Sequence, residues 1–414
     1  MPTDVSDERD AGGDAPSTGG TTHGVLYVAS TFGHLRSFHV PYIRAMVERG
    51  DRVTLVAAGD PANLADLVGA GGVEGIMGSA AGAPAERRRG SLRIVRVPFV
   101  KKMSSPSNFA AACAIARMLR TGDYDLMLTH TALAAFFARL GVGWSGRRDL
   151  RVVNTVHGYL FGEEGDGMKS ALLLQAERMT AGVTDEIVTM NAEDTRIATG
   201  RRLCRGPVVQ VDGMGVPEAA HPHAPTADER ARARECLGVP QDAFVLLCAA
   251  EFSARKNQRV LVEALPSLPD DVMLALPGTG ALRQEVADLA HDLGVEGRVA
   301  MPGFCDDLAS WRAAADVCVS ASRSEGLPFH AMEAMAAGLP LVLSTVKGHV
   351  DLVEEGVNGL TFPSDDAAWL ARAVMRLRAD PAERLAMGRA SLERAPRYSL
   401  ERVMPRLMGI YEGE

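Results

Sequence analysis

Short apolar runs alternate with longer segments of mixed polarity, and the alternation forms two series along the chain. The apolar runs predict strands in the first series at residues 25–29, 52–56, 124–129, 152–156, 186–190 and 208–211, and its helices include 40–49 and 132–140. The second series predicts strands at 244–248, 272–276, 299–301, 316–320 and 341–343. Apolar strands separated by helices are typical of parallel sheets buried on both faces. We therefore predict an α/β chain with two doubly wound domains.

Turn-forming residues mark the junction between the two series. The run Gly213-Met214-Gly215-Val216-Pro217 and the stretch 221–225 are rich in glycine, proline and other turn formers. We place the first domain at residues 23–216 and the second at 217–395. Residues 1–22 are acidic, rich in Gly, Ser and Thr, and have no apolar core, so we expect a disordered tail and no export signal.

Composition narrows the class of protein further. Hydrophobic residues make up 47% of the 414, enough for two cores, and the net charge of −8 argues against nucleic-acid binding. No uncharged apolar run approaches the ~18 residues of a membrane span. The six cysteines contain no C-x-x-C pair and lie mostly in apolar contexts, which predicts buried, reduced thiols in a cytoplasmic protein.

Two glutamates eight residues apart carry the clearest chemistry. Glu325 follows the strand at 316–320, and Glu333 lies in a predicted helix whose first turn contains Pro328. Gly338 ends that helix as a C-terminal cap. The free N–H groups at its start, from residue 326 to 330, form an anion site. Two carboxylates beside an anion site suit a ligand with hydroxyls and phosphates, such as a sugar nucleotide.

Other polar residues follow the predicted strands. In open parallel sheets, ligands bind at the carboxyl ends of the strands. The residues in these positions are Phe32, Gly33, His34, His130, His157, Gly158, Glu251, Lys256, Gly278, Thr279, Gly280 and Glu325. They predict a cleft between two domains that face each other.

The segment around the two glutamates resembles a known signature. Ser324-Glu325-Gly326-Leu327-Pro328, followed by Glu333-Ala334-Met335-Ala336-Ala337-Gly338-Leu339-Pro340, resembles the E-x7-E motif of retaining glycosyltransferase family 4. The resemblance implies the GT-B fold, with two Rossmann-like domains facing a central cleft. The first would bind the acceptor and the second the nucleotide sugar. A C-terminal helix within residues 396–414 would pack back towards the first domain.

The resemblance also implies an activity. It predicts a hexosyltransferase that moves a sugar, with retained configuration, from a nucleotide diphosphate sugar to a hydroxyl. We expect a UDP-linked donor and a glycan, lipid-linked or small-molecule acceptor. No cofactor and no obligatory metal are implied. The D-x-D match Asp123-Tyr124-Asp125 lies at the amino end of a strand, which is the wrong edge for a catalytic metal.

Site roles follow from the same resemblance. Lys256 would neutralise the diphosphate, Glu325 would bind hydroxyls of the donor sugar, and His157 would touch the sugar or the phosphate; these three are the predicted catalytic residues. The glycine Gly33 would let the diphosphate approach the backbone, Phe304 would meet the base and Glu333 the ribose diol. The full set predicted to bind donor or nucleotide is Gly33, Arg255, Gly278, Phe304, Gly326, Leu327, Pro328, Phe329 and Glu333.

One position departs from the family pattern. Many members carry an arginine about five residues before the lysine, and here that position is Glu251. The run Ala249-Ala250-Glu251-Phe252-Ser253, continuing to Arg255-Lys256-Asn257-Gln258, is similar to a branch that makes bacterial surface polysaccharides. We expect Arg255 to supply the second positive charge.

A basic segment stands out in this acidic chain. Its positive residues are Arg87, Arg88, Arg89, Arg93, Arg96, Lys101 and Lys102. One interpretation is a surface for an anionic membrane or a lipid-diphosphate acceptor, since each basic residue adds about 1 kcal/mol there. That would make the protein cytoplasmic and peripheral to the inner face of the cell membrane. The other interpretation is a solvated variable loop. We expect the segment to lie in the first domain, away from the donor residues.

Two other function classes stay open. A GT-B sugar-nucleotide epimerase or hydrolase shares the fold and cleft, although the Glu-Gly-Leu-Pro context argues against it. A non-catalytic donor-binding partner subunit is suggested by Glu251. Incubation with donor alone would reveal the first class, and binding without turnover would reveal the second.

Overall fold

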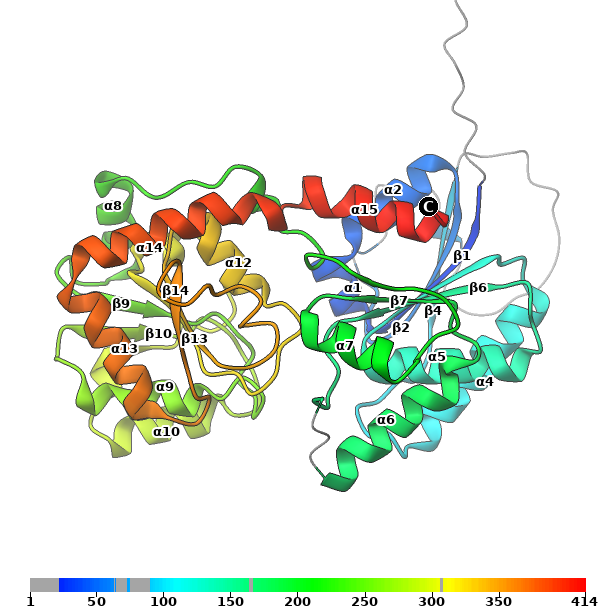
Figure 1. Ribbon diagram of the computed structural model, residues 1–414, viewed down its shortest axis with the longest axis horizontal. Coiled ribbons are helices and arrows are strands. Elements are labelled where there is room, and N and C mark those ends of the chain that lie inside the picture. The colour runs from blue at the N-terminus through cyan, green and yellow to red at the C-terminus, as the bar shows by residue number, and fades with distance from the viewer. Residues whose placement is uncertain (1–21, 63, 65–72, 75–89, 164–166, 306–307) are drawn as a thin grey trace, which may run out of the picture.

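The computed structural model describes residues 22–62, 64, 73–74, 90–163, 167–305 and 308–414. The predicted tail at 1–22 lies outside the described residues except for Thr22, and so do Arg87, Arg88 and Arg89 of the basic segment. The chain folds into two lobes, each built on one sheet with helices on both sides (Figure 1).

The first lobe contains an eight-stranded sheet in the order β3-β4-β2-β1-β5-β6-β7-β8. All of its strand pairs are parallel, and Tyr27 pairs with Leu55 on one side and Leu128 on the other. The strands are β1 Gly24–Thr31, β2 Arg52–Ala58, β3 Val73–Glu74, β4 Ser91–Arg96, β5 Leu126–His130, β6 Arg151–Val156, β7 Glu186–Thr189 and β8 Val208–Gln210. The helices are α1 Phe32–Phe38, α2 Val40–Arg49, α4 Pro106–Thr121, α5 Ala132–Ser145, α6 Gly167–Ala181 and α7 Ala192–Gly200.

The second lobe contains a six-stranded parallel sheet in the order β11-β10-β9-β12-β13-β14. The strands are β9 Phe244–Leu247, β10 Val272–Ala275, β11 Val299–Ala300, β12 Val317–Ser320, β13 Leu341–Ser344 and β14 Gly359–Phe362. The α-helices are α8 Ala227–Leu237, α9 Gln258–Ala264, α10 Arg283–Asp292, α11 Ala309–Ala314, α12 Phe329–Ala336, α13 Ala367–Ala379, α14 Pro381–Arg394 and α15 Leu400–Glu412. Short 3-10 helices are η1 Pro217–Ala220, η2 Leu265–Ser267, η3 Glu296–Arg298 and η4 Ala395–Tyr398.

Each sheet is buried on both faces, as the apolar runs predict. Along β1, Val25, Tyr27 and Ala29 belong to one buried cluster, whereas Leu26 and Val28 belong to another. Because successive side chains point to opposite faces of a strand, a continuous apolar run fills two cores. The cluster that contains Val25 also includes residues of α12 and α15, so one core is continuous across the two lobes.

The basic segment forms a strand that the sequence analysis missed. Residues 91–96 are β4, with Leu92 and Ile94 buried and Arg93 and Arg96 exposed. Leu92 and Ile94 lie on one face of the strand, which Arg96 continues at the exposed end, whereas Arg93 lies on the other face with the half-buried Val95. The interpretation as a loop is therefore wrong for this part. Strands β3 and β14 were also missed.

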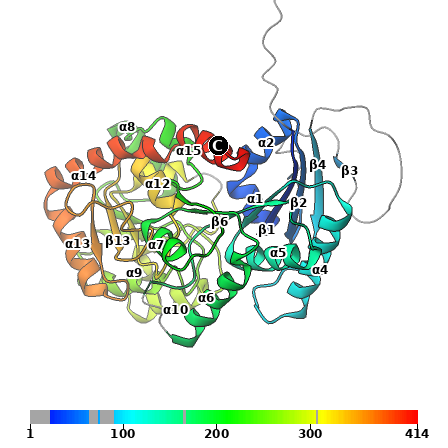
Figure 2. The same cartoon turned by 45° about the vertical axis from the view of Figure 1, so that its right-hand side comes forward.

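The C-terminal helix α15 contacts the first lobe. In Figures 1 and 2 it runs above the junction and ends beside α2. Arg151 of β6 donates to the carbonyl oxygens of Ile410 and Tyr411, at 2.6 and 2.8 Å. The Tyr411 hydroxyl lies 3.4 Å from Oγ1 of Thr155. These contacts fit the packing that we expected for this helix, which links the lobes on the side that carries α2.

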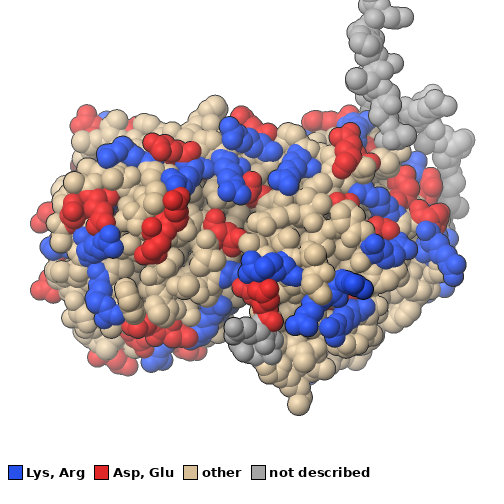
Figure 3. Space-filling model, in the orientation of Figure 1, with Lys and Arg blue, Asp and Glu red and all other residues tan. Residues whose placement is uncertain are grey.

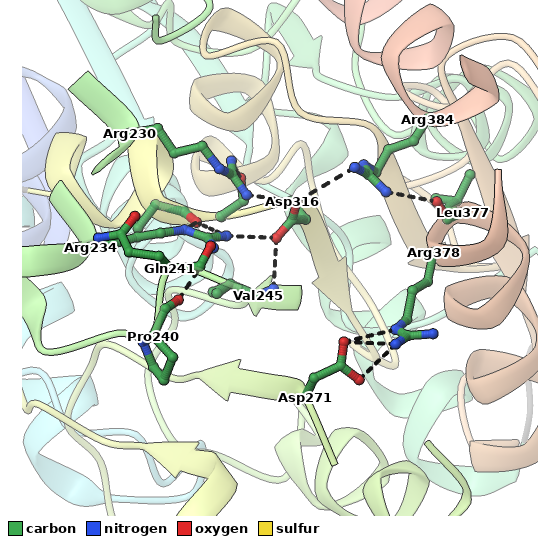
Figure 4. A network of polar contacts seen from close by, with 12 residues as sticks. Arg230, Arg234, Pro240, Gln241, Val245, Asp271, Asp316, Leu377, Arg378 and Arg384 are labelled. Atoms are coloured by element: carbon green, nitrogen blue, oxygen red, sulfur yellow. Dashed lines mark hydrogen bonds and ion pairs between the residues drawn. The ribbon is translucent and has the colours of Figure 1, made fainter. Parts of the chain in front are cut away.

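Charged contacts brace the second sheet at its amino-terminal edge (Figure 4). Asp316, directly before β12, accepts from Arg234 at 2.9 Å and from the Val245 N–H at 2.8 Å, and pairs with Arg230 at 2.6 Å. Its side chain is 8% exposed. This network ties α8 to the sheet and leaves the opposite, carboxyl edge to form the cleft.

Candidate active site

A cavity of about 480 Å³ lies between the two lobes at the carboxyl edges of both sheets. From the first lobe it is lined by His34, Phe38, His157, Gly158, Leu160 and Met190. From the second lobe it is lined by residues 249–251, 255, 256 and 324–330. The predicted cleft is therefore present, and it contains Glu325, Lys256, Arg255 and His157 together.

Glu325 is the most strongly held carboxylate in this cavity. Lys256 Nζ donates to its Oε1 at 2.6 Å, and Arg255 donates from Nη1 to its Oε2 at 2.8 Å. The Glu325 side chain is only 6% exposed, whereas that of Arg255 is 42% exposed. Burial alone would raise the pKa of the Glu325 carboxyl, but Lys256 and Arg255 outweigh burial and lower this pKa to about 2. The carboxylate is thus ionised, and two cations are held at the cleft.

The loop from Ser324 to Pro328 presents the start of α12 to the same cavity. Pro328 is the N-cap of the helix, one position before the first turn that the sequence predicted for it. Because the N–H groups at a helix start have no intrahelical partner, this end attracts anions. Gly338, with φ of 71°, follows the last turn as predicted.

Glycines allow the two lobes to touch through their backbones at the floor of the cleft. A Cβ on Gly326 would lie 2.3 Å from the carbonyl oxygen of His157. A Cβ on Gly348 would lie 2.5 Å from the carbonyl oxygen of Gly326, and Gly348 has φ of 78°. Both approaches are too close for any side chain. The contact fixes the Glu325 loop against the loop that carries His157.

Four histidines form the first-lobe wall. His130 Nδ1 lies 3.2 Å from His157 Nε2, and His39 Nδ1 lies 2.8 Å from the Tyr27 hydroxyl. The ring of His34 is 4.9 Å from that of His39 and 5.0 Å from that of His157, between centroids. Burial lowers the pKa of all four imidazoles, to about 4 for His34. The wall is therefore uncharged at neutral pH.

A second buried ion pair bridges the lobes below the cavity. Lys347, after β13, donates to Asp194 Oδ1 and to the carbonyl oxygen of Phe161, both at 2.8 Å. Asn191 donates to Asp194 Oδ2 at 2.8 Å and to the Gly326 carbonyl at 3.0 Å. Burial raises the pKa of Asp194 in spite of the lysine.

Four of the predicted donor residues lie outside this cavity. Glu333 accepts from Arg312 at 2.9 Å and lines a separate cavity of about 580 Å³ with α8 and α11. Gly278 has φ of 148°, and its N–H donates to the Gly303 carbonyl at 2.7 Å. Phe304 follows and is 75% exposed. Gly33 is exposed and lies in α1, not in a loop.

One described lysine of the basic segment, Lys101, lies near a residue of the cavity. Lys101 Nζ is 4.0 Å from Oε1 of Glu251, which lines the cavity. Glu251 is not one of the predicted donor residues, so this contact brings Lys101 to the edge of the cavity without contradicting the expectation that the segment lies away from them. Lys102 is exposed.

Several residues of the site were not predicted. Lys347 and His349 follow β13, so the rule that ligands meet the carboxyl ends of strands could have found them. His349 packs against Ser344, and its Nδ1 lies 2.9 Å from the Ser344 Oγ. The negative charge of Glu325 acts on the His349 imidazole and favours its protonated form. His39 lies between α1 and α2, and no local signal marks it.

Comparison with known proteins defines the family. The profile described as glycosyl transferases group 1 matches residues 243–380, and the glycosyl transferase 4-like domain matches residues 41–212. EpsD from Bacillus subtilis (strain 168), named as a glycosyltransferase, is 30% identical over 395 residues, covering 94% of this chain and 96% of EpsD. The chain belongs to the family-4-like glycosyltransferases. The resemblance noted in the sequence is confirmed.

Other similar proteins support the same family and fold. The D-inositol 3-phosphate glycosyltransferase 1 of Catenulispora acidiphila is 29% identical over 323 residues, which are 72% of this glycosyltransferase chain and 74% of that protein. The crystal structure of HepE from Anabaena, in complex with UDP and glucose, superposes with a TM-score of 0.72 at 16% identity. The match covers 95% of this chain and all of HepE. The GT-B fold is thus confirmed.

Two further expectations concern membrane spans and the burial of the cysteines. Among the described residues, no helix is both long and apolar enough to cross a membrane. The cysteines are free, but only Cys248 and Cys318 are buried, while Cys113 and Cys236 are exposed. The expectation of generally buried thiols is therefore wrong.

Proposed function

We propose that this glycosyltransferase is a retaining hexosyltransferase that moves a sugar from a UDP-linked donor to an acceptor hydroxyl. The observation that carries the proposal is the Glu325 carboxylate held by Lys256 and Arg255 inside the inter-lobe cavity. The set combines an acceptor for sugar hydroxyls with two cations for a diphosphate. The solved complexes of HepE with UDP and with UDP-glucose support the choice of nucleotide.

Donor binding rearranges the ion pairs of Glu325. The sugar hydroxyls take the carboxylate as their acceptor, while Lys256 and Arg255 turn to the diphosphate. The start of α12 adds its free N–H groups. These groups face the charge that develops on the leaving diphosphate, and preorganised groups of this kind are usually the largest contribution to catalysis. His157 contacts the sugar from the opposite wall.

The nucleoside extends towards Phe304 and Glu333. Phe304 is largely exposed at the end of a strand-to-helix connection, where an aromatic face can stack on a base. Glu333 reaches the ribose diol from the second turn of α12, once its contact with Arg312 yields. Gly33 leaves room for the phosphates because it carries no side chain and has open space beside it. Gly278 contributes through its backbone, since a Cβ there would lie 2.0 Å from the carbonyl oxygen of Ala250, a residue that lines the cavity.

The acceptor approaches from the first lobe. Met168, Leu172 and Met179 on α6 are 82, 66 and 62% exposed. The lower tip of that lobe, formed by α6, shows few charged side chains in Figure 3. Together with Lys101 and Lys102, this surface supports a lipid-linked acceptor held by a cytoplasmic enzyme peripheral to the inner membrane face. A glycan or small-molecule acceptor fits the same cleft without that contact.

Charge stabilisation comes from the chain itself in this proposal, so transfer needs no obligatory metal. Lys256, Arg255 and the helix start fill the role that a divalent ion has in other transferases. Transfer that continues at the same rate in EDTA supports this point, and transfer that stops until Mg²⁺ or Mn²⁺ is restored contradicts it.

A donor screen followed by a transfer assay tests the function. We expect one UDP-sugar to raise the melting temperature of the full chain, since a ligand that binds the folded state stabilises it. With hydroxyl acceptors, that donor should yield a product of retained anomeric configuration by NMR. Glu325→Gln should nearly abolish transfer. Epimer or free sugar formed from the donor alone would indicate an epimerase or hydrolase, and donor binding with no turnover would indicate a partner subunit.

A further inference from the structure

Three histidines in the first-lobe wall beside the cavity direct nitrogen atoms to one place. One ring nitrogen each of His34, His39 and His157 lies within 4.8 Å of the other two. They come from the start of α1, the α1–α2 junction and the end of β6, so the first-lobe fold assembles them from distant parts of the chain.

Two of these side chains contain buried nitrogen atoms without a partner. Among the described residues, Nε2 of His34 and Nε2 of His39 are buried and have no hydrogen-bond partner. His39 is fully buried, and its other nitrogen is engaged by the Tyr27 hydroxyl. An unpartnered buried polar atom costs about 1–3 kcal/mol, so an arrangement that leaves two of them side by side points to a missing ligand.

We propose that His34, His39 and His157 bind one divalent transition-metal ion of the zinc class, and that the ion inhibits sugar transfer. The inhibition rests on the proposed function, because the ion withdraws His157 from the donor sugar. The binding of the ion does not depend on that function.

The chemistry of the three ligands selects the kind of ion. Neutral imidazoles suit zinc, copper and nickel, whereas magnesium and calcium require oxygen ligands. His39 Nδ1 can donate to the Tyr27 oxygen, which fixes the ring with Nε2 facing the ion.

The geometry requires a small closure. Zinc–nitrogen bonds of about 2.0–2.1 Å in a tetrahedron place the nitrogens roughly 3.4 Å apart. His34 and His157 are only partly buried and line the cavity, so their rings are the ones that move inward. The fourth position faces the cavity, where water or an oxygen of a ligand completes the tetrahedron.

Metal titration of the full chain tests the site without an assay of transfer. After treatment with EDTA and dialysis, Zn²⁺ is titrated against a chromophoric chelator, and Co²⁺ is followed through its visible bands. We expect one ion per chain and the intense bands of tetrahedral cobalt. His34→Gln and His39→Gln should each weaken binding at least about tenfold. His291→Gln, a surface histidine paired with Glu296, is the matched control and should bind like the wild type.

Folding is monitored separately, because His39 lies in the core. If His39→Gln unfolds, the half-buried His34 decides the question through His34→Gln alone. The proposal is overturned if the wild type binds no stoichiometric ion, or if His34→Gln binds zinc as tightly as the His291→Gln control. Where transfer is measurable, micromolar Zn²⁺ should inhibit the wild type and the control, and Mg²⁺ should not. Zinc binding without inhibition would overturn the inhibitory role and leave the ion site standing.

Discussion

Two buried carboxylates at the lobe junction are each held by a lysine, yet their surroundings differ. Asp194 and Lys347 sit below the cavity, 0 and 6% exposed, and their pair bridges the two lobes. Glu325 and Lys256, 6 and 13% exposed, line the cavity and belong to the same lobe. Burial raises the pKa of Asp194. Burial acts in the same direction on Glu325, but Lys256 and then Arg255 outweigh it and lower the pKa of that carboxyl to about 2.

The difference shows how one kind of ion pair serves two purposes. Asp194 also accepts from Asn191 and from the Tyr159 N–H, and Lys347 donates to a carbonyl as well, so the closed set holds the lobes together. The Glu325 set carries an excess positive charge and opens to the cavity. Such a set can exchange its partners for those of an anionic ligand, while the closed one cannot without separating the lobes.

The largest expected effect is the loss of stability when the pair of Asp194 and Lys347 is broken. Lys347→Met should lower the free energy of unfolding by about 3–5 kcal/mol, because it leaves a buried carboxylate without its cation. Lys256→Met should cost less stability, since Arg255 still faces Glu325. Urea denaturation of both variants measures the contrast. Lys347→Met combined with Asp194→Asn should regain part of the loss, and equal losses for the two single variants would contradict the distinction between a closed and an open pair.

The second effect concerns catalysis at the open pair. Lys256→Ala should remove about 2–4 kcal/mol of transition-state stabilisation, by analogy with the loss of one oxyanion-hole donor. This corresponds to roughly a 30- to 900-fold fall in turnover at saturating donor. Arg259→Ala is the control, because Arg259 pairs with Glu263 on the exposed face of α9. A Lys256→Ala enzyme with wild-type turnover would show that the assigned phosphate role is wrong.

The fold was largely predictable because the strands are continuous apolar runs. The central strands β1, β5, β9 and β12 are buried on both faces, and no competing period obscures them. The strand β4 was missed because Arg93 and Arg96 interrupt its apolar positions and drew attention to charge. β14 has the sequence Gly-Leu-Thr-Phe, in which Gly359 and Thr361 interrupt the apolar positions, so no continuous apolar run marks it.

Only those site residues that follow a strand directly were predictable from the sequence. Glu325, Lys256 and His157 each follow a strand, so the carboxyl-edge rule brings them to one cleft. The relative position of the two lobes depends on contacts far apart in sequence, such as Gly326 against His157 and Lys101 near Glu251. No local pattern contains that information. The pairing of Glu325 with Lys256 and Arg255 lies within one lobe, but its partners are 69 and 70 residues apart in the sequence, so no local pattern contains it either.

A smaller effect concerns how the free energy of unfolding depends on pH, to which the histidine wall and Glu325 contribute differently. His34, His39, His130 and His157 have pKa values lowered by burial, so the unfolded chain binds more protons below about pH 6.5. Stability is then lost as pH falls, by about 1.4 kcal/mol per pH unit for each such histidine, down to about pH 4 for His34. Glu325, with a pKa of about 2, stays ionised throughout this window.

Denaturation at pH 7, 6 and 5 measures this dependence. His130→Asn should make the fall in stability between pH 6 and 5 less steep by one histidine's share, whereas the exposed His291→Asn should leave the slope unchanged. An identical slope for wild type and His130→Asn would mean that the buried ring is protonated in the folded state.

The smallest expected effect concerns UDP binding by variants of Arg255 and Glu251. Glu251 occupies the position where many family members carry an arginine. Arg255 is 42% exposed and donates to Glu325, so Arg255→Ala should weaken UDP binding by up to about 1 kcal/mol, or roughly fivefold. Glu251 is 59% exposed and lies near Lys101 across the cleft, so Glu251→Ala removes only a negative charge at the rim. Its UDP affinity should stay the same or rise slightly. Calorimetry with free UDP at 0.1 M salt gives both values under one screening condition. If both substitutions change the affinity equally and only slightly, neither side chain reaches the diphosphate. Arg255 then interacts with Glu325 but not with the ligand.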